Sequence, residues 1–250
     1  MIRYIRAVLS IFFIVIYDYF TWMLKFSRHP EKYDIQVRYD KVRHLIMRLN
    51  KYFRITYYKK NAHIFDQEGP FLFICNHLSM YDVITAISLS KQPITFVGKQ
   101  EIKKAPFVGR LMRILGGVLI DRDNLKMEIK ALQTVRQSLI KRQVSWFIFP
   151  EGTRNTSTEG ELLPFKAGTF KLALDSKVSI VPVAIYGTFR PLNMKYKHSR
   201  FPIHVSLFEP VSYEQIKDLN TIKIAEQISD LINTELKIIK QENDAIYQKK

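Results

Sequence analysis

The sequence has a single cysteine, Cys75, so it cannot build the disulfide framework that staples many small secreted proteins. It has no HExxH or CxxC cluster, and we therefore expect no metal site. It also lacks an uninterrupted apolar run of the roughly 20 residues that a membrane-spanning helix needs, and it has no internal repeat. These absences exclude a disulfide-stapled or repeat protein and favour one globular domain with a short appendage.

Acidic residues are also scarce, because 23 Asp and Glu stand against 39 Lys and Arg, which gives a net charge of +16. Such an excess indicates an anionic partner: nucleic acid, an acidic lipid surface or a phosphorylated substrate. The basic residues are spread along the chain rather than gathered in one arm or recognition motif, so we expect no nucleic-acid partner.

The N-terminal segment is apolar but interrupted. Arg3 and Arg6 precede the apolar residues 7–17, and after Asp18 a second apolar patch fills residues 19–24. No small-residue cleavage site is visible after it, so we do not expect a secretory signal. A charge near the middle disfavours a span, and we expect a helix or helical hairpin in the membrane interface, with a single span as the alternative. The rest of the chain is then expected at the cytoplasmic face of the cell membrane, against an anionic lipid surface.

The remaining chain alternates short apolar runs with segments of helical periodicity. The expected strands are residues 71–75, 94–98, 117–121, 145–149 and 179–186, and the expected helices are residues 31–50, 124–141 and 221–240. This alternation predicts an α/β domain whose mostly parallel central sheet is covered by helices on both faces. Residues 201–208 alternate strictly and predict a half-buried strand nearer an edge. The expected parts are membrane-anchoring helices (1–50), the α/β domain (51–240) and a frayed polar tail (241–250).

The most informative segment runs from Asn76 to Asp82 and directly follows an expected strand. An α/β sheet places its active site at the carboxyl ends of such strands. His77 has the side chain best suited to removing a proton near neutral pH, and Asp82 can hold the imidazole in one tautomer. A structural interpretation stands beside this one: Ser79 and Asp82 match a capping box for the next helix, and His77 would then only hydrogen-bond in the loop. The two interpretations do not exclude each other.

A second informative segment, residues 149–154 with the sequence FPEGTR, also follows an expected strand. Gly152 lets the backbone approach a ligand, Thr153 offers a hydroxyl, and Arg154 can bind a phosphate through two hydrogen bonds. Lys166, at the start of the next expected helix, adds another cation. The alternative is an ordinary surface turn with an ordinary arginine.

Together these segments resemble the ordered motifs of the glycerophospholipid acyltransferases, and within that family the bacterial type of 1-acylglycerol-3-phosphate acyltransferases. Residues 76–82 resemble the first motif, NHxSxxD. Residues 99–109 resemble the second motif, and residues 116–122 resemble its companion GxxFIDR, with leucine in place of the aromatic residue. Residues 149–154 resemble the third motif and residues 180–183 the fourth.

The resemblance covers about residues 60 to 190 and implies a reaction. By this resemblance His77 is the general base that takes the proton of the acceptor's hydroxyl, and Asp82 orients it. The activated oxygen attacks an acyl thioester, either acyl-CoA or acyl carrier protein, and no cofactor is expected. The residues expected to bind the phosphate-bearing acceptor are Lys99, Arg122, Glu151, Gly152, Thr153, Arg154 and Lys166.

We therefore expect an enzyme that acylates lysophosphatidic acid to phosphatidic acid in phospholipid biosynthesis. Two alternatives stay open: an acyltransferase for glycerol-3-phosphate or another lysophospholipid, and a non-catalytic basic protein that binds membranes. The groove for the acyl chain is expected between the sheet and the anchor, with the site facing the membrane.

Overall fold

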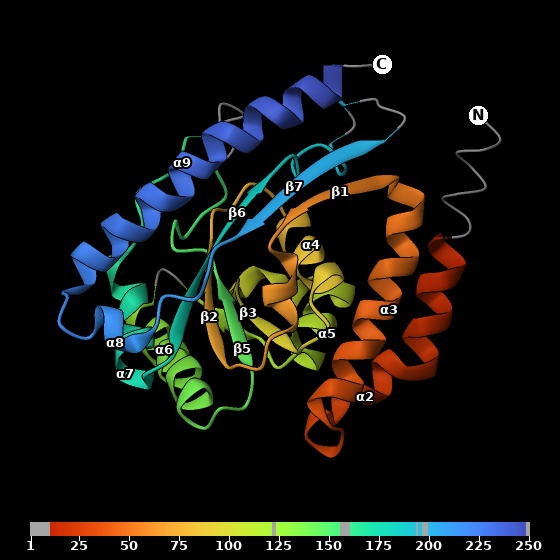
Figure 1. Cartoon of the computed structure of the whole chain (residues 1–250). Coiled ribbons are helices and arrows are strands. Elements are labelled where there is room, and N and C mark those ends of the chain that lie inside the picture. The colour runs from red at the N-terminus through yellow and green to blue at the C-terminus, as the bar shows by residue number, and fades with distance from the viewer. Residues whose placement is uncertain (1–10, 122–123, 156–160, 194, 197–199, 249–250) are drawn as a thin grey trace.

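The computed structural model describes residues 11–121, 124–155, 161–193, 195–196 and 200–248. Within these residues one seven-stranded sheet has the strand order β1-β7-β6-β2-β5-β3-β4 (Figure 1). The strands are β1 (Ile55–Lys60), β2 (Phe71–Cys75), β3 (Ile94–Lys99), β4 (Val118–Ile120), β5 (Ser145–Ile148), β6 (Ser179–Tyr186) and β7 (Phe201–Leu207). Every neighbouring pair is parallel except β6 and β7. The predicted α/β fold with a mostly parallel sheet is confirmed.

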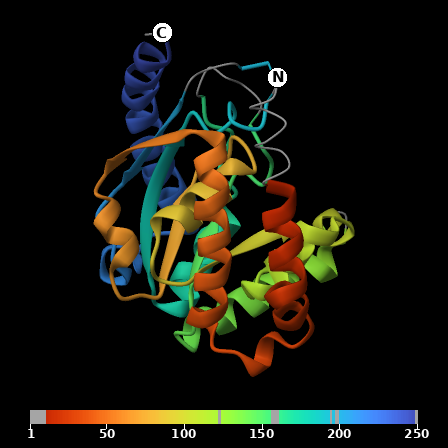
Figure 2. The same cartoon turned by 90° about the vertical axis from the view of Figure 1, so that its right-hand side faces the viewer.

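Helices cover both faces of this sheet (Figures 1 and 2). The helical segments are η1 (Tyr19–Met23), α2 (Leu24–Arg28), η2 (Pro30–Lys32), α3 (Ile35–Phe53), η3 (Ala62–Asp66), α4 (Tyr81–Leu89), η4 (Gln100–Lys104), α5 (Pro106–Ile114), α6 (Leu125–Ile140), η5 (Ala167–Phe170), α7 (Lys171–Ser176), α8 (Tyr213–Ile216) and α9 (Thr221–Gln248). Alternate strand residues point to opposite faces, so Phe73 and Phe147 pack with α3, α4 and α5. Leu72 and Trp146 pack with α6, α7 and α9 on the other face. The sheet is therefore buried on both sides.

Helix α3 begins later than the periodicity of residues 31–50 predicts. The side chain of Asp34 accepts hydrogen bonds from the backbone N–H groups of Gln36 and Val37, which makes Asp34 the N-cap. Residues 30–32 form the separate 3₁₀ turn η2, which starts with a proline. The predicted helix is thus corrected to residues 35–53, whereas the helix expected at 124–141 matches α6 closely.

Strand β7 differs from the half-buried strand predicted at residues 201–208. It lies next to the edge, as expected, but six of its seven residues are buried. The edge position belongs to β1, which the apolar pattern did not predict because half of its residues are exposed. Ile203 and Val205 face the core shared with α3, while His204 and Ser206 are buried beside α9 and pair with side chains of that helix.

The polar tail predicted at residues 241–250 is wrong as far as the structure describes it, because α9 continues to Gln248. Asn243 is fully buried and donates to Pro202 O at 3.0 Å, and Asp244 pairs with Arg190 at 2.6 Å. These side-chain contacts hold the last turns of α9 against β7 and the segment after β6.

The N-terminal segment is helical from residue 11 and packs beside α3 and α5 (Figure 2). Trp22, Met23 and Phe26 are buried in the same core as α3. Asp18 is also buried, and its carboxylate lies 3.0 Å from the guanidinium of Arg48 on α3. Among the described helices, none has the combination of length and apolarity needed to cross a bilayer. The interfacial placement of this segment stays a prediction.

Candidate active site

Three neighbouring parallel strands end on the same side of the sheet, and each leads into a segment of the candidate site. Strand β2 leads into residues 76–82, β5 leads into residues 149–155, and β3 ends at Lys99. Because β2, β5 and β3 are adjacent and parallel, their carboxyl ends meet. The predicted segments, far apart in sequence, are thereby brought together around one cavity.

His77 and Asp82 form a hydrogen-bonded pair at the end of β2. The distance from His77 Nδ1 to Asp82 Oδ2 is 2.7 Å, and the side chain of Asp82 is fully buried while that of His77 is 17% exposed. The imidazole stacks on the ring of Phe149 with centroids 4.0 Å apart. Since Nδ1 is committed to Asp82, Nε2 is the nitrogen left to face the cavity that His77 lines. This is the geometry of a general base held in one tautomer.

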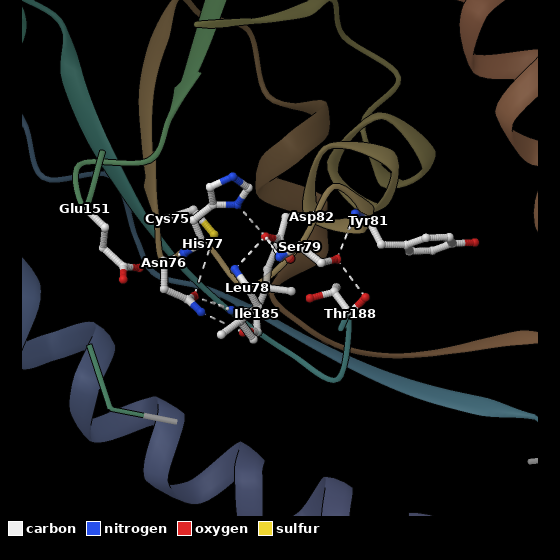
Figure 3. A network of polar contacts seen from close by, with 10 residues as sticks. All are labelled: Cys75, Asn76, His77, Leu78, Ser79, Tyr81, Asp82, Glu151, Ile185 and Thr188. Carbon is white, nitrogen blue, oxygen red and sulfur yellow. Dashed lines mark hydrogen bonds and ion pairs between the residues drawn. The ribbon is translucent and has the colours of Figure 1, made fainter. Parts of the chain in front are cut away.

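The carboxylate of Asp82 also organises the backbone of its loop. Its Oδ2 atom accepts hydrogen bonds from the N–H groups of Leu78 and Ser79, each at 2.8 Å (Figure 3). The hydroxyl oxygen of Ser79 accepts from the N–H of Tyr81 at 2.9 Å, and the helix N-cap is Met80. The Asp82 carboxylate therefore makes the contacts that both interpretations expect, to His77 and to the backbone before α4, although not as a complete capping box centred on Ser79.

Two polar side chains fasten this loop to β6 and the residues just after it (Figure 3). The amide of Asn76 makes a pair of 2.9 Å hydrogen bonds with the backbone of Ile185, donating from Nδ2 to the carbonyl and accepting at Oδ1 from the N–H. The Ser79 hydroxyl donates to the carbonyl of Thr188 at 2.7 Å. The sequence matched Asn76 and Ser79 to a motif but gave no signal of these partners, because both partners lie more than 100 residues away.

Glu151 holds the backbone of the candidate base. Its Oε1 atom accepts from the N–H of His77 at 2.7 Å and its Oε2 atom accepts from the N–H of Leu163 at 3.2 Å. From the same loop, the N–H of Asn155 donates to the carbonyl of His77 at 2.7 Å. Burial raises the pKa of Glu151 to about 7. Glu151 thus holds the backbone of His77, and its predicted contact with the acceptor stays a prediction.

Among the described residues, the cations that line the cavity are Lys99, Arg154 and Lys166. Gly152 has φ +71°, and a Cβ atom there would lie 2.8 Å from Lys166 Cε and 3.1 Å from its Nζ, so glycine leaves room for the ammonium group. Lys99 lies 2.6 Å from Glu101, which offsets part of its charge. Arg154 and Lys166 are therefore the stronger anion-binding candidates.

Two other predicted residues have different outcomes. Thr153 lines the cavity beside Arg154, and its predicted contact with the acceptor stays a prediction. Arg122 lies outside the described residues, so its predicted contact with the acceptor stays a prediction. Among the described residues, no group of three or more His, Cys, Asp or Glu could hold a metal ion.

The cavity has a volume of about 660 Å³, and its two kinds of lining come from different elements. The ends of the strands and the segments that follow them supply His77 and the cations (the polar end), whereas α3, α4 and α5 supply apolar side chains (the apolar end). The apolar wall includes Val42, Leu45, Ile46, Leu49, Val83, Ile84, Ile87, Leu111 and Met112. The apolar stripe of α3 was visible in the sequence, but only the fold shows that it lines the site. Such a shape can hold a ligand with an anionic head and a long apolar chain.

A protein-family model described as "Acyltransferase" matches residues 54–186. The chain is 35% identical over 147 residues to the 1-acyl-sn-glycerol-3-phosphate acyltransferase of Escherichia coli (strain K12), a match that covers 59% of each protein. It is 31% identical over 171 residues to the enzyme of the same name from Saccharomyces cerevisiae, which covers 68% of this chain and 56% of that one. The matched segments thus span less than two thirds of these relatives.

Among solved structures, the fold is similar to that of the 1-acyl-sn-glycerophosphate (LPA) acyltransferase PlsC from Thermotoga maritima. The TM-score is 0.74 at 22% sequence identity, and the match covers 96% of this chain and 97% of the other. At this identity the likeness concerns the fold, and it extends beyond the family match to the N-terminal helices and α9.

Proposed function

Since this chain belongs to the acyltransferase family, we propose that it transfers a fatty acyl group from a thioester to the free hydroxyl of 1-acylglycerol-3-phosphate, which yields phosphatidic acid. The observation that carries the proposal is the contact of 2.7 Å between His77 Nδ1 and Asp82 Oδ2 at the junction of a cationic and an apolar part of one cavity. The names of the curated relatives support the same acceptor.

In the proposed mechanism, His77 Nε2 takes the proton from the acceptor's hydroxyl as that oxygen attacks the carbonyl carbon of the thioester. The resulting tetrahedral intermediate collapses with cleavage of the carbon–sulfur bond, and the imidazolium returns its proton to the leaving thiolate. Asp82 stabilises the imidazolium in between, because its buried carboxylate already accepts the Nδ1 hydrogen. No nucleophilic side chain is required, since the acceptor supplies the attacking oxygen.

The acceptor's phosphate is proposed to bind Arg154 and Lys166. A guanidinium group can bind a phosphate through two parallel hydrogen bonds, and the ammonium over Gly152 adds a second positive charge. Lys99 lies on the same cavity and contributes less because Glu101 pairs with it. The acyl chain fits the apolar end between α3, α4 and α5. The donor is a thioester of coenzyme A or of acyl carrier protein.

The N-terminal helix is proposed to lie in the interface of the cell membrane, on its cytoplasmic face. It exposes an aromatic stripe to solvent, in which Phe12, Phe13, Tyr17 and Phe20 are 56%, 65%, 65% and 67% exposed. Residues at this spacing share one side of a helix, and aromatic rings favour the headgroup region. Asp18 does not oppose this placement, because it is buried against Arg48 instead of facing lipid. The excess of basic residues favours an anionic surface and not nucleic acid.

The proposal is tested by acyl transfer from a radiolabelled thioester to three acceptors: lysophosphatidic acid, glycerol-3-phosphate and lysophosphatidylcholine. We expect lysophosphatidic acid to be the preferred acceptor, because only it combines a phosphate monoester with an acyl chain that favours the interface. Preference for glycerol-3-phosphate or lysophosphatidylcholine would overturn the acceptor assignment. Absence of transfer to all three, in a protein that still binds anionic vesicles, would favour a non-catalytic membrane-binding protein.

A further inference from the structure

Tyr81 joins the catalytic loop to a part of the molecule that the proposed mechanism does not use. It is the first residue of α4, its backbone N–H donates to the Ser79 hydroxyl at 2.9 Å, and it directly precedes Asp82 in the chain. Its side chain is fully buried and points away from His77 and Asp82 (Figure 3). The ring packs edge-on against Phe53 with centroids 5.8 Å apart.

The hydroxyl of Tyr81 is hydrogen-bonded to Asn50 on α3. It donates to Asn50 Oδ1 at 2.5 Å, and Asn50 Nδ2 in turn donates to Ser88 Oγ at 2.8 Å and to the Tyr57 hydroxyl at 3.1 Å. Desolvation raises the pKa of both tyrosines, so both hydroxyls stay protonated, Tyr81 as the donor to Asn50 and Tyr57 as an acceptor from it. One amide thus connects α3, β1 and both ends of α4. Asn50 lies outside the residues that match the family model.

Helix α3 also contacts the other parts of the site. Its residues Val42, Leu45 and Ile46 wall the apolar end of the cavity, and Arg48 pairs with Asp18 of the N-terminal helix at 3.0 Å. The first turn of α4, which carries Asp82, is therefore tied to the helix that shapes the acyl groove. A shift of that turn would move the Asp82 carboxylate away from His77, because three hydrogen bonds converge on a single oxygen atom.

We propose that Asn50 and Tyr81 are positioning residues. They fix the first turn of α4 against α3 and so hold the His77–Asp82 pair at a constant position relative to the acyl groove. The inference rests on the proposed function for its catalytic consequence. Its structural consequence is independent of any substrate. Loss of the Tyr81 hydroxyl should loosen the loop without emptying the ring's packing site, since phenylalanine keeps the contact with Phe53.

The test compares Tyr81→Phe with Tyr57→Phe, because both remove one hydroxyl that is bonded to Asn50 and only the first belongs to the catalytic loop. Amide hydrogen exchange at Leu78 and Ser79, whose N–H groups donate to Asp82, reports the loop directly. We expect about tenfold faster exchange and a similar fall in kcat for Tyr81→Phe, with the KM for the acceptor unchanged. Tyr57→Phe should change neither.

A second pair of variants tests whether Asn50 Oδ1, which accepts the hydrogen bond from the Tyr81 hydroxyl, is the atom that matters. Asn50→Leu should reproduce the Tyr81→Phe result, and Asn50→Asp, which keeps an oxygen for the Tyr81 hydroxyl, should restore slow exchange. Equal exchange in Tyr81→Phe and Tyr57→Phe would overturn the inference. Fast exchange in Tyr81→Phe alone, in a protein that does not acylate lysophosphatidic acid, would support the positioning role and overturn the proposed function.

Discussion

Two regions of the molecule each place a histidine beside a carboxylate, and they differ in what the second ring nitrogen contacts. His77 Nδ1 is bonded to Asp82, and Nε2 faces the cavity. His204 Nδ1 accepts from the Asn243 amide at 2.9 Å, and its Nε2 lies 3.6 Å from Glu242. An acidic neighbour alone therefore does not single out a candidate base. We expect the base to be the histidine whose second nitrogen is left open at the carboxyl end of a strand.

The two regions also differ in what their polar contacts hold. Around His77 they converge on a loop at the mouth of a cavity. Around His204 they fasten α9 to the sheet: Glu235 pairs with Lys60 at 3.0 Å and accepts from Ser206 at 2.7 Å. Arg190, nearby, pairs with Asp244 of the same helix. We expect changes in the first region to lower turnover and changes in the second region to lower stability.

The largest effect is expected from Asp82→Asn. It removes the charge that stabilises the imidazolium and the acceptor that fixes the tautomer of His77, so kcat should fall by about 10²–10⁴-fold. The matched control is Glu235→Gln, which neutralises another buried carboxylate in the α9 region. Steady-state kinetics of both proteins checks the comparison. Equal losses of kcat in the two variants would show that the loss comes from neutralising any buried carboxylate and not from disrupting the His77–Asp82 pair.

The next effect concerns stability. Arg190 is buried, pairs with Asp244 at 2.6 Å, and stacks on the rings of Phe189 and Tyr247 at 4.7 and 4.4 Å. Arg190→Ala should lower the free energy of unfolding by about 3 kcal/mol, because it leaves polar groups of α9 without their partner. The exposed pair of Arg136 with Asp175 is the control, and its loss should cost under about 1 kcal/mol. Urea denaturation measures both, and kcat should stay at the wild-type value below the unfolding transition.

A smaller effect is expected from Arg154→Ala at the polar end of the cavity. If Arg154 binds the acceptor's phosphate, its loss should raise the KM for lysophosphatidic acid by about 10- to 100-fold, the cost of one charge-assisted contact. The value of kcat should change less, because the base is intact. Lys171→Ala, which removes an exposed cation that does not line the cavity, is the control. A similar rise in KM for both variants would indicate only a general loss of positive charge.

The smallest effect is a difference in pH dependence. Burial raises the pKa of Glu151 to about 7 from 4.5, so within this window the folded protein keeps a proton that the unfolded chain releases. Protonated Glu151 therefore contributes to the free energy of unfolding below pH 4.5. This contribution, on the order of 2 kcal/mol, is lost as the pH rises through about 7. Glu151→Gln should remove that loss. Urea denaturation at about pH 5 and about pH 8 measures it, and an unchanged pH dependence in the variant would contradict the assignment.

His204 should give the opposite slope. Burial lowers the pKa of His204 below its usual value of 6.5. Below that pH the unfolded chain therefore binds more protons than the folded protein does, and the free energy of unfolding falls as the pH drops. The variant His204→Gln should therefore lose less stability on acidification than the wild type does. Thus one buried group of the catalytic region and one of the α9 region shift the pH dependence in opposite directions.

Local patterns predicted the strands and singled out the candidate site, because these signals lie in short segments. The apolar runs gave the strands, and the residue types of His77, Asp82 and Arg154 suggested their chemistry. What failed depends on contacts distant in sequence. The burial of β7 requires β1 and β6 beside it in the sheet and α9 against one of its faces, and the end of α9 is held by Arg190, more than 50 residues earlier. Likewise, nothing in FPEGTR shows that the carboxylate of Glu151 faces the backbone of His77, because that contact joins residues 74 positions apart.

The most direct test of the central claim is acyl transfer to lysophosphatidic acid by His77→Ala and His204→Ala, each checked for folding by circular dichroism. We expect His77→Ala to lower kcat by about 10³-fold, because the general base is lost. The variant should keep the fold, because His77 lies in a loop at the carboxyl end of β2 and not in the core. His204→Ala should lower the unfolding temperature and keep kcat. Wild-type turnover in His77→Ala, or loss of turnover in a folded His204→Ala protein, would contradict the central claim.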